Sequence, residues 1–309
     1  MTAADPLLAD YRHLRDDVAA YRLPRDFVRL DGPEAASYLG GQCSQDLSAL
    51  AVGESADTLL LAPDGKVNAL ARVLRFADLV FHLDVDAGHG DAVLARLARF
   101  KLRSRFDLGP LDWRCVALRG PALPERVELR SPAVAPFDWN GWHGVDLMGP
   151  ADSIEVPPSV DWCSAAAWEA ARIESGIPVM GREITEGVIP AETGVVERTV
   201  SFTKGCFTGQ ELVARIDSRG AAVPYHLEGL VLAGDPDPDG LVGAELVIEG
   251  KERAVGRVTS AARCPGVGSV CALAYVHRSV TVPGQLLVLR AGDDRADAVA
   301  ASVRALPLL

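Results

Sequence analysis

The sequence predicts an α+β fold that ends in a small β-rich region. Between residues 57 and 85, apolar residues recur with a period of two, and the connections between these runs are too short to cross over a sheet. This spacing predicts an antiparallel meander, with helical patterns before and after it. Past residue 240, short β-rich runs alternate with glycines, which suits a small barrel or sandwich.

The first half of the chain is expected to contain a surface helix, a strand followed by a helix, and the meander. The apolar residues between 7 and 21 have helical spacing, with Arg and Asp between them, which predicts an amphipathic helix. A short strand at 27–30 and a helix around 35–39 should follow. Strands are then expected at 59–62, 67–76 and 79–85, and a helix at about 91–101.

In the second half of the chain, glycine and proline residues mark the expected ends of helices and strands. The stretch from 120 to 160 is rich in both and is expected to form loops and edge strands. A helix is expected over 165–175, because Gly176 and Pro178 are typical of residues just past a helix end. The turn cluster Gly234–Gly240 is a candidate boundary. Beyond it, strands are expected at 246–248, 254–260, 270–276 and 286–290.

Composition limits the classes of function. The 309 residues carry 31 Lys+Arg against 42 Asp+Glu, a formal net charge of −11, which disfavours a broad nucleic-acid-binding face but leaves room for a local positive pocket. No apolar run approaches the roughly 18 residues of a membrane helix, and no secretory signal is visible. The cysteines and histidines show neither C-x-x-C nor H-x-x-x-H spacing. These features predict a cytoplasmic protein without direct nucleic-acid binding, membrane association or a metal site.

Residues 200–220 hold the most chemically suggestive pattern in the chain. They predict a strand, a tight loop and a short helix, with Thr208 and Glu211 spaced as a capping box. Cys206 comes just before this helix and two residues after Lys204, so the helix dipole and the ammonium would both stabilise a thiolate. The alternatives are that Cys206 is a small buried apolar side chain and that Glu211 only caps the helix.

The segment Lys204–Glu211, K-G-C-F-T-G-Q-E, resembles the K-G-C-Y-x-G-Q-E signature of the YgfZ-like folate-binding family. That family is related to the T-protein, or aminomethyltransferase, of the glycine cleavage system. Phe207 stands where the family has Tyr, and the aspartate that T-proteins use to orient the folate has no assigned match, since Asp91 is typical of a helix N-cap. Further matches lie in the expected order: L-D-G-P-E-A at 30–35, L-G-G-Q-C-S-Q-D at 39–46, R-I-E-S-G-I-P at 172–178 and V-G-R-V-T-S at 255–260.

The resemblance implies a T-protein-like ring. Two interleaved antiparallel-sheet and helix parts would occupy residues 1–225, and a C-terminal β-barrel would occupy residues 226–309. Tetrahydrofolate, or a one-carbon-substituted folate, would lie in the central channel.

The resemblance also implies a set of site residues. Cys206 would be the catalytic residue, near N5 and N10 of the folate, as a nucleophile or as a redox or cluster contact. Glu174 matches the carboxylate that T-proteins place against the pterin edge, which offers paired N–H donors; a surface charge at a helix end is the alternative. The other cofactor-binding candidates are Lys204, Gln210, Arg215, which could instead pair with Glu211, and Asp46, which could instead cap a turn.

The function implied is a folate-dependent accessory role in assembling or repairing iron–sulfur clusters on client enzymes, including tRNA-modifying ones. One alternative is an aminomethyltransferase, which Cys206 disfavours because T-proteins lack this cysteine. The other is an interaction module without a ligand, which the glycines at 205 and 209 disfavour. An anionic folate polyglutamate tail would approach through a local basic patch, for which the candidates are Lys204, Arg215, Arg219, Lys101, Arg103 and Arg105.

Overall fold

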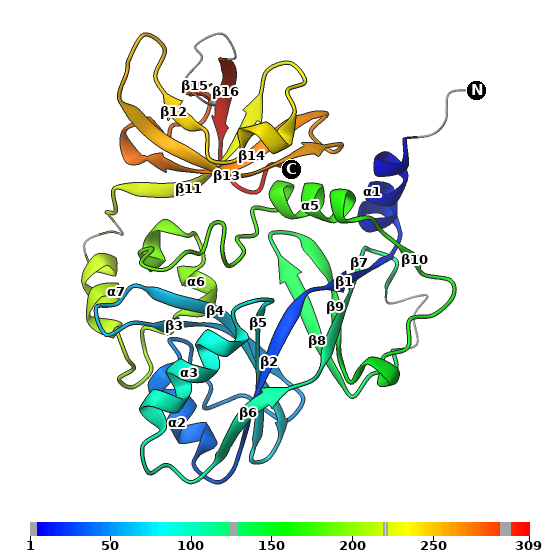
Figure 1. Cartoon of the computed structure of the whole chain (residues 1–309), viewed down its shortest axis with the longest axis vertical. Helices are drawn as coiled ribbons and strands as arrows, with labels where there is room; N and C mark the ends of the chain where they lie inside the picture. The colour runs from blue at the N-terminus through cyan, green and yellow to red at the C-terminus, as the bar shows by residue number, and fades with distance from the viewer. Residues whose placement is uncertain (1–4, 124–128, 219, 221, 291–297) are drawn as a thin grey trace.

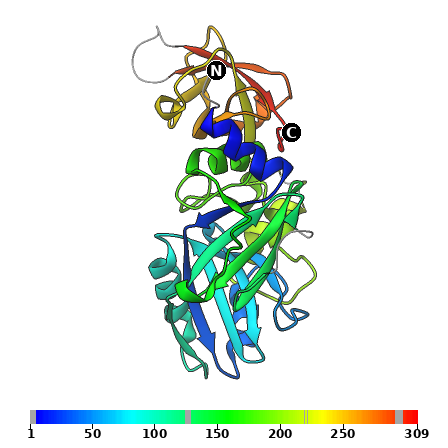
Figure 2. The ribbon, with the colours of Figure 1, turned by 90° about the vertical axis from the view of Figure 1, so that its right-hand side faces the viewer.

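The computed structural model describes residues 5–123, 129–218, 220, 222–290 and 298–309. In this part of the chain, two five-stranded sheets and a closed barrel account for the main β-structure. Figure 1 shows the barrel above the two sheets, and Figure 2 shows helices α1 (Pro6–Asp16) and α5 (Ala165–Glu174) between the barrel and the sheets. Among the described residues, no helix combines the length and the apolar character that crossing a membrane requires.

The first sheet has the strand order β3-β4-β5-β2-β6. Helices α2 and α3 pack against it, and Leu30, Leu39 and Leu97 belong to the shared apolar cluster. The predicted meander is confirmed, because β3 pairs with β4 and β4 with β5, both antiparallel. The elements are β2 (Arg25–Asp31), α2 (Ala35–Gln42), β3 (Ser55–Leu61), β4 (Val67–Ala77), β5 (Val80–Asp86), α3 (Gly90–Lys101) and β6 (Asp107–Leu111).

The second sheet has the order β10-β1-β7-β9-β8 and takes strands from both sides of the first sheet in the sequence. The two α+β parts are therefore interleaved, as predicted. Its strands are β1 (Ala19–Leu23), β7 (Arg114–Arg119), β8 (Ala133–Trp139), β9 (Trp142–Gly149) and β10 (Asp161–Trp162).

The prediction of loops and edge strands over 120–160 was only partly right. Strand β8 lies at an edge, but β9 lies between β7 and β8 and buries Leu147 and Met148. The turn between β8 and β9 is Asn140-Gly141, with positive φ angles of 50° and 81°. Asn-Gly is favoured in such two-residue hairpin turns, so this dipeptide marks the hairpin of β8 and β9.

The predicted helix over 7–21 is too long. Helix α1 ends at Asp16, and the chain enters β1 at Ala19, where it pairs with β7 in an antiparallel register. Val18 and Tyr21 therefore belong to the sheet side of this junction. Their β-branched and aromatic side chains favour a strand once a partner strand is available.

The later helices follow the glycine signals more closely than the capping signals. Helix α5 ends before Gly176, which has a positive φ of 66°, as predicted. Helix α7 (Gln210–Asp217) is present, but its N-cap is Gly209 and no side chain caps it, so the predicted capping box of Thr208 and Glu211 is wrong. The predicted strand at 200 is also absent, because α6 (Val196–Thr199) runs into the loop directly.

The C-terminal region is a closed barrel with the order β11-β14-β13-β12-β15-β16. This outcome decides between the barrel and the sandwich that the sequence left open. The Gly234–Gly240 cluster lies inside the barrel, between β11 and β12, rather than at a boundary. The strands are β11 (Tyr225–Leu232), β12 (Glu245–Val247), β13 (Ala254–Cys264), β14 (Ser269–His277), β15 (Leu286–Arg290) and β16 (Val299–Arg304).

Candidate functional site

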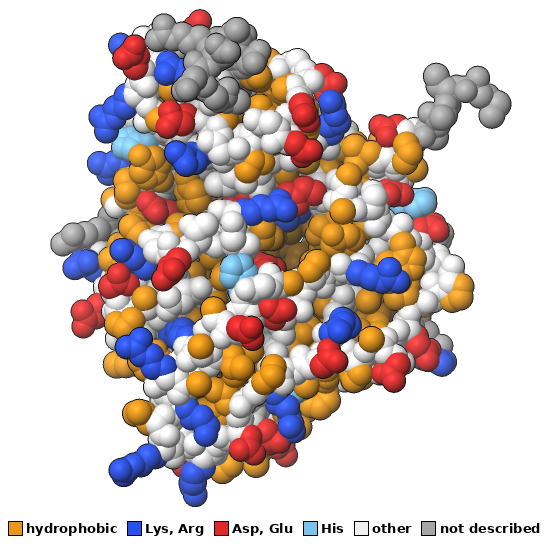
Figure 3. Space-filling view, viewed as in Figure 1, with side chains coloured by type: hydrophobic (Ala, Val, Ile, Leu, Met, Phe, Trp, Pro, Cys, Tyr) orange, Lys and Arg blue, Asp and Glu red, His pale blue; other side chains and the backbone are white. Residues whose placement is uncertain are grey.

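A cavity of about 690 Å³, including its open mouth, lies where the two sheets meet beneath α5. Figure 3 shows a hollow in the middle of the corresponding face of the molecule. Its wall combines aromatic rings with charged side chains, namely Phe137, Trp139, Trp142, Trp168, Arg25, Asp57, Arg72, Asp86, Arg119, Asp146 and Arg172.

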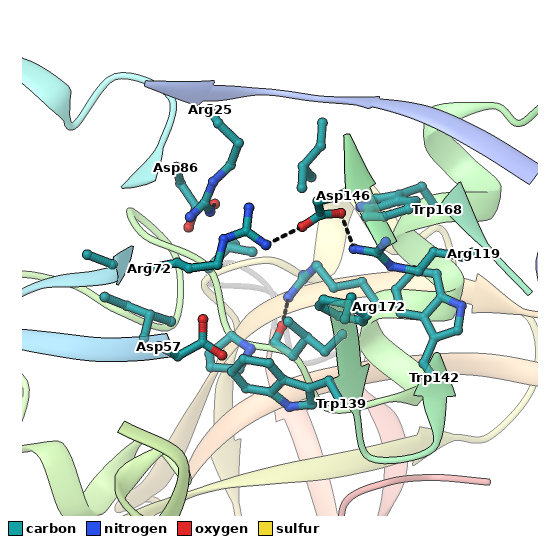
Figure 4. A pocket seen from close by; sticks show the side chains of 17 residues that line it. Arg25, Asp57, Arg72, Asp86, Arg119, Trp139, Trp142, Asp146, Trp168 and Arg172 are labelled. Atoms are coloured by element: carbon teal, nitrogen blue, oxygen red, sulfur yellow. Dashed lines mark hydrogen bonds and ion pairs between the residues drawn. The ribbon is translucent and has the colours of Figure 1, made fainter. Parts of the chain in front are cut away.

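A network of ion pairs forms the polar side of this cavity (Figure 4). Arg72 is buried and joins the two sheets, since it pairs with Asp84 of β5 at 2.9 Å and with Asp146 of β9 at 2.6 Å. Arg119 also pairs with Asp146, at 2.7 Å. Burial acts to raise the pKa of Asp146, but the two guanidinium groups outweigh it and lower that pKa to about 2. Asp146 is therefore ionised at neutral pH, and its two ion pairs link β4, β7 and β9 in the cavity wall.

Arg25 extends the same network along the first sheet. Its guanidinium pairs with Asp84 at 2.6 Å and with Asp86 at 2.5 Å. Asp86 accepts a second hydrogen bond, from the backbone N–H of Met180 at 2.8 Å. Both Asp86 oxygens are thus engaged, and the 177–181 segment is attached to the cavity wall.

Asp57 differs from the other carboxylates of the wall because only one of its two oxygens has a partner among the described residues. One of its oxygens, Oδ2, pairs with Nε of Arg198, and the other has no partner among the described residues. The guanidinium of Arg198 also lies 4.5 Å from the centre of the Trp139 ring. In Figure 4, the side chains of Asp57, Arg72 and Trp139 point toward the same space. An acceptor beside a flat apolar ring suits a planar ligand with N–H donors.

Two buried donors in the cavity wall also have no acceptor within the described protein. They are Nε of Arg119 and the indole Nε1 of Trp142. Both side chains are almost completely buried, at 0% and 2% exposed. Both N–H groups are themselves closed off from solvent, so they do not face the open space of the cavity.

The structure places Glu174 outside this cavity. It is fully buried, at 0% exposed, and joins α1, α5 and the barrel. Its carboxylate accepts hydrogen bonds from the Tyr11 hydroxyl at 2.5 Å, from Arg15 at 3.0 Å and from the backbone N–H of Gly266 at 3.0 Å. In this structure its oxygens are taken up by protein donors, which is the environment of an anchoring group.

Lys204 also uses its charge within the protein. Its ammonium donates to three backbone carbonyl groups at the end of α2 and just beyond, those of Gly40, Cys43 and Gln45, at 2.8, 2.7 and 2.9 Å. A cation at a helix C-terminus is favoured by the helix dipole. Burial lowers the pKa of Lys204, in keeping with this enclosed position.

The other predicted residues lie at or near the surface around the motif. Cys206 and Arg215 are exposed, and Gln210 accepts a hydrogen bond from the backbone N–H of Phe207 at 2.9 Å. Asp46 is exposed and accepts from the backbone N–H of Ser48 at 2.9 Å, a bond that lowers its pKa.

The predicted residues are therefore not brought together in one place. The motif that carries Cys206 leads into α7 on one side of Figure 1, whereas Glu174 contacts α1 on the other side. None of the six predicted site residues is among the described residues that line the cavity. Cys206 is not among the residues that line this cavity, and its predicted proximity to a folate stays a prediction.

The predicted basic patch is also not assembled. Lys101 ends α3, and Arg103 and Arg105 lie in the loop after it rather than on a strand. Arg105 pairs with Glu34 at 2.6 Å. Arg219 lies outside the described residues.

The cavity residues Asp57, Arg72, Trp139 and Asp146 were not among the residues predicted from the sequence. One signal was available, because Arg72 stands within an apolar β-patterned run, where an unpaired charge would be costly. Such a residue predicts a buried partner, but the sequence does not identify which carboxylate provides it.

Comparison with known proteins agrees with this architecture. Residues 226–308 match the model of the glycine cleavage T-protein C-terminal barrel domain. The fold resembles the crystal structure of glycine cleavage system aminomethyltransferase T from Bartonella henselae, with a TM-score of 0.84, 21% identity, and 98% of this chain and 89% of that chain covered. The chain thus has the T-protein fold over nearly its whole length.

Three relatives show the range of names attached to similar sequences. A tRNA-modifying protein YgfZ from Cronobacter sakazakii is 28% identical, over 67% of this chain and 71% of the relative. An iron–sulfur cluster assembly factor IBA57 homolog from Pyricularia oryzae is 26% identical, over 87% and 75%. An aminomethyltransferase from Streptomyces avermitilis is 24% identical, over 83% and 77%. Over most of its length the chain is thus similar to aminomethyltransferases and to proteins named YgfZ and IBA57, and its C-terminal barrel matches the T-protein barrel model.

Proposed function

We propose that this protein binds tetrahydrofolate, or a one-carbon-substituted folate, in the central cavity and serves as an accessory factor for iron–sulfur clusters on client enzymes, including tRNA-modifying ones. In this proposal residues 1–225 hold the folate and residues 226–309 form the barrel region. The observation that carries the proposal is the cavity between the sheets, with its aromatic wall and its half-free carboxylate at Asp57. The named YgfZ and IBA57 relatives supply the accessory role.

The cavity residues suit a pterin. The pterin is a flat ring with N–H donors along one edge, so its face can stack on Trp139 while its edge donates to the free oxygen of Asp57. When bound, the folate would supply a carrier for a one-carbon unit at N5 and N10. The protein residues would bind the ring, orient it and exclude water from it.

Cys206 has a different place in this proposal. The thiol is exposed and lies outside the cavity, on the segment between Lys204 and α7. It is therefore available to a client protein or its cluster at the surface. Its role there would be that of a nucleophile, a redox group or a cluster contact, and the client assay distinguishes these roles.

The first test measures folate binding together with client activity. Isothermal titration with 5-formyltetrahydrofolate should give saturable binding with one site per chain. Removing the gene from its host should lower the activity of iron–sulfur enzymes without lowering their protein levels, and the wild-type gene should restore that activity. Absence of folate binding would contradict the ligand assignment, and unchanged iron–sulfur enzymes would contradict the accessory role.

An aminomethyltransferase is the second candidate, because the fold and several relatives fit it. We expect no methylenetetrahydrofolate when the protein is incubated with tetrahydrofolate and an aminomethylated lipoyl protein. Stoichiometric or catalytic formation of that product would favour the transferase instead.

A further inference from the structure

A second and larger hollow runs along α3. It has an empty volume of about 1700 Å³, including its open side, and lies between α3, the turn that joins β3 to β4, and the loop 180–186. We refer to it as the α3 groove. In Figure 1, α3 lies on the face of the molecule that carries the central hollow of Figure 3.

Arg96 is the fixed cation of the α3 groove. Its guanidinium donates only to neutral acceptors: Oδ1 of Asn68 at 3.2 Å, Oε1 of Gln42 at 3.2 Å and the carbonyl of Leu61 at 2.7 Å. Within the described part of the chain, no carboxylate forms an ion pair with it. By contrast, the arginines that line the central cavity, Arg25, Arg72, Arg119 and Arg172, all pair with carboxylates.

A partly buried guanidinium without a counter-charge is costly to the protein alone. Burial lowers the pKa of Arg96, which shows that its surroundings disfavour the charged form. After these three bonds, two of its five N–H groups have no acceptor among the described residues. An anion in the groove would supply both the missing charge and the missing acceptors.

The rim of the α3 groove adds to this positive character. Arg99 follows Arg96 by three residues on the same helix, is exposed, and lines the groove. His89 lines the groove at the beginning of the helix, and Glu186 is the one acidic residue among its described lining residues. The local balance is therefore positive in a chain whose net charge is −11.

The α3 groove is next to the central cavity. Pro178 and Val179 line the cavity, and the following residues Met180 and Gly181 line the groove. Strand β4 is shared in the same way, with Leu70 in the cavity wall and Asn68 in the groove wall. The cavity and the groove thus share the 178–181 segment and strand β4 as their common wall.

From this juxtaposition we propose that the α3 groove binds the poly-γ-glutamate chain of the folate, with Arg96 as its principal cation. This inference rests on the proposed folate binding in the cavity. A γ-glutamyl chain is flexible and gains one carboxylate with each added residue, which matches an elongated groove with an unpaired guanidinium. The residues expected from the sequence to form the basic patch do not take this role, because Lys204 is bound to backbone carbonyls and Arg105 is paired with Glu34.

The test compares 5-formyltetrahydrofolate with one and with five γ-linked glutamates by isothermal titration at low salt. For the wild type, the pentaglutamate should bind about tenfold more tightly, the size expected for one or two hydrogen bonds to a charged group. Arg96→Gln should reduce this ratio to about twofold or less and leave the monoglutamate affinity nearly unchanged. The ratio should also fall at high salt, because the site is partly exposed.

Two further variants distinguish a loss of the binding site from a general effect on folding or charge. Arg99→Gln at the exposed rim should lower the ratio partially, and Arg103→Gln, an equal charge change at an exposed position outside the groove, should leave it unchanged. Equal affinities of the wild type for both folates would overturn the assignment of the groove while leaving folate binding intact. If neither folate bound, the proposed function would fail, and this inference with it.

Discussion

Asp57 is the residue on which specific recognition in the cavity depends most. In Asp86 and Asp146, both carboxylate oxygens accept hydrogen bonds from protein donors. In Asp57, one oxygen has no partner among the described residues and can accept from a ligand. A carboxylate in this position can accept from the donor edge of a pterin without breaking an existing ion pair. The sequence offered no sign of this role, because Asp57 lies outside every matched motif.

Asp57→Asn is therefore expected to weaken folate binding about tenfold, since a hydrogen bond to a charged group contributes about 1.5–3 kcal/mol. The fold should be retained, because the amide has nearly the same shape. Isothermal titration measures the change. The matched control is Asp64→Asn at an exposed position in the turn after β3, which should bind like the wild type. Equal affinities for the two variants would show that Asp57 does not contact the ligand.

Cys206→Ser is expected to separate binding from function. The thiol is exposed and outside the cavity, so folate affinity should change by less than about twofold, well under the 1.4 kcal/mol of a tenfold change. Restoration of iron–sulfur enzyme activity in the deleted host should be lost. A tenfold drop in affinity would instead place the thiol at the ligand, and full restoration would exclude thiol chemistry.

Motif residues can be recognised from sequence more easily than their contacts can. Lys204 and Glu174 were expected to touch the folate, yet each is saturated by protein groups in the folded chain. Their partners come from α1, the end of α2 and the barrel, which lie far away in the sequence. Only the tertiary structure determines whether a charged side chain pairs with groups of the protein or remains able to bind a ligand.

At the scale of elements, residues 204–209 contact two segments of the first α+β part, the end of helix α2 and the end of strand β3. Lys204 holds the end of α2, and the backbone of Gly209 packs so closely on β3 that an added Cβ would lie 2.5 Å from the Ala62 carbonyl oxygen. Gly209 also has a positive φ of 81°, so a side chain there would be strained. These same segments provide the Gln42 and Leu61 acceptors for Arg96. The motif thereby supports the wall of the α3 groove from behind.

Lys204→Met should lower the free energy of unfolding by about 2–4 kcal/mol, because three partly buried carbonyl groups lose a charged donor. Urea denaturation provides the measurement. Lys66→Met, which removes a half-exposed ammonium 3.5 Å from Asp64, should cost less than about 1 kcal/mol. Undiminished stability of Lys204→Met together with lost folate binding would identify Lys204 as a ligand residue instead.

Strand β11 carries a pH-sensitive contribution through Glu228. Burial raises the pKa of this carboxyl from 4.5 to about 7. The folded chain therefore keeps a proton that the unfolded chain has released in this interval, and the associated stability is lost as the pH rises through about 7.

Glu228→Gln should accordingly stabilise the protein at pH 8 but not at pH 4. A full shift of this size is worth about 3 kcal/mol, and the partial solvent exposure of the side chain reduces the expected gain to about 1–2 kcal/mol. The measurement is urea denaturation at both pH values. Glu249→Gln, at an exposed position, serves as the control and should show no pH-dependent difference. A gain of equal size at both pH values would contradict the assigned titration.

Elements with strong local signals were predictable, and elements set by pairing were less so. The meander, α2, α3 and α5 follow from periodicity, and Gly176 additionally marks the end of α5. The end of α1 and the central position of β9 depend on strands that lie elsewhere in the sequence. Neither hydrophobic spacing nor turn residues specify which strand becomes the neighbour.

For the whole molecule, the cavity is a product of the interleaved topology. Strands β1 and β2 are consecutive in the chain but belong to different sheets, so the polypeptide crosses between the sheets beside the cavity. The Arg72–Asp146 pair then joins the sheets at 2.6 Å, and α5 closes one side. The resemblance described from the sequence implied two interleaved α+β parts followed by a barrel. Only the structure identified the residues that line the cavity.

The most direct test of the central claim is a crystal structure of the protein with 5-formyltetrahydrofolate. The account predicts electron density for the pterin in the cavity, stacked near Trp139 with its donor edge on Asp57, and Cys206 at the surface away from the ring. Density for the pterin beside Cys206 or Glu174, with the cavity between the sheets empty, would contradict it.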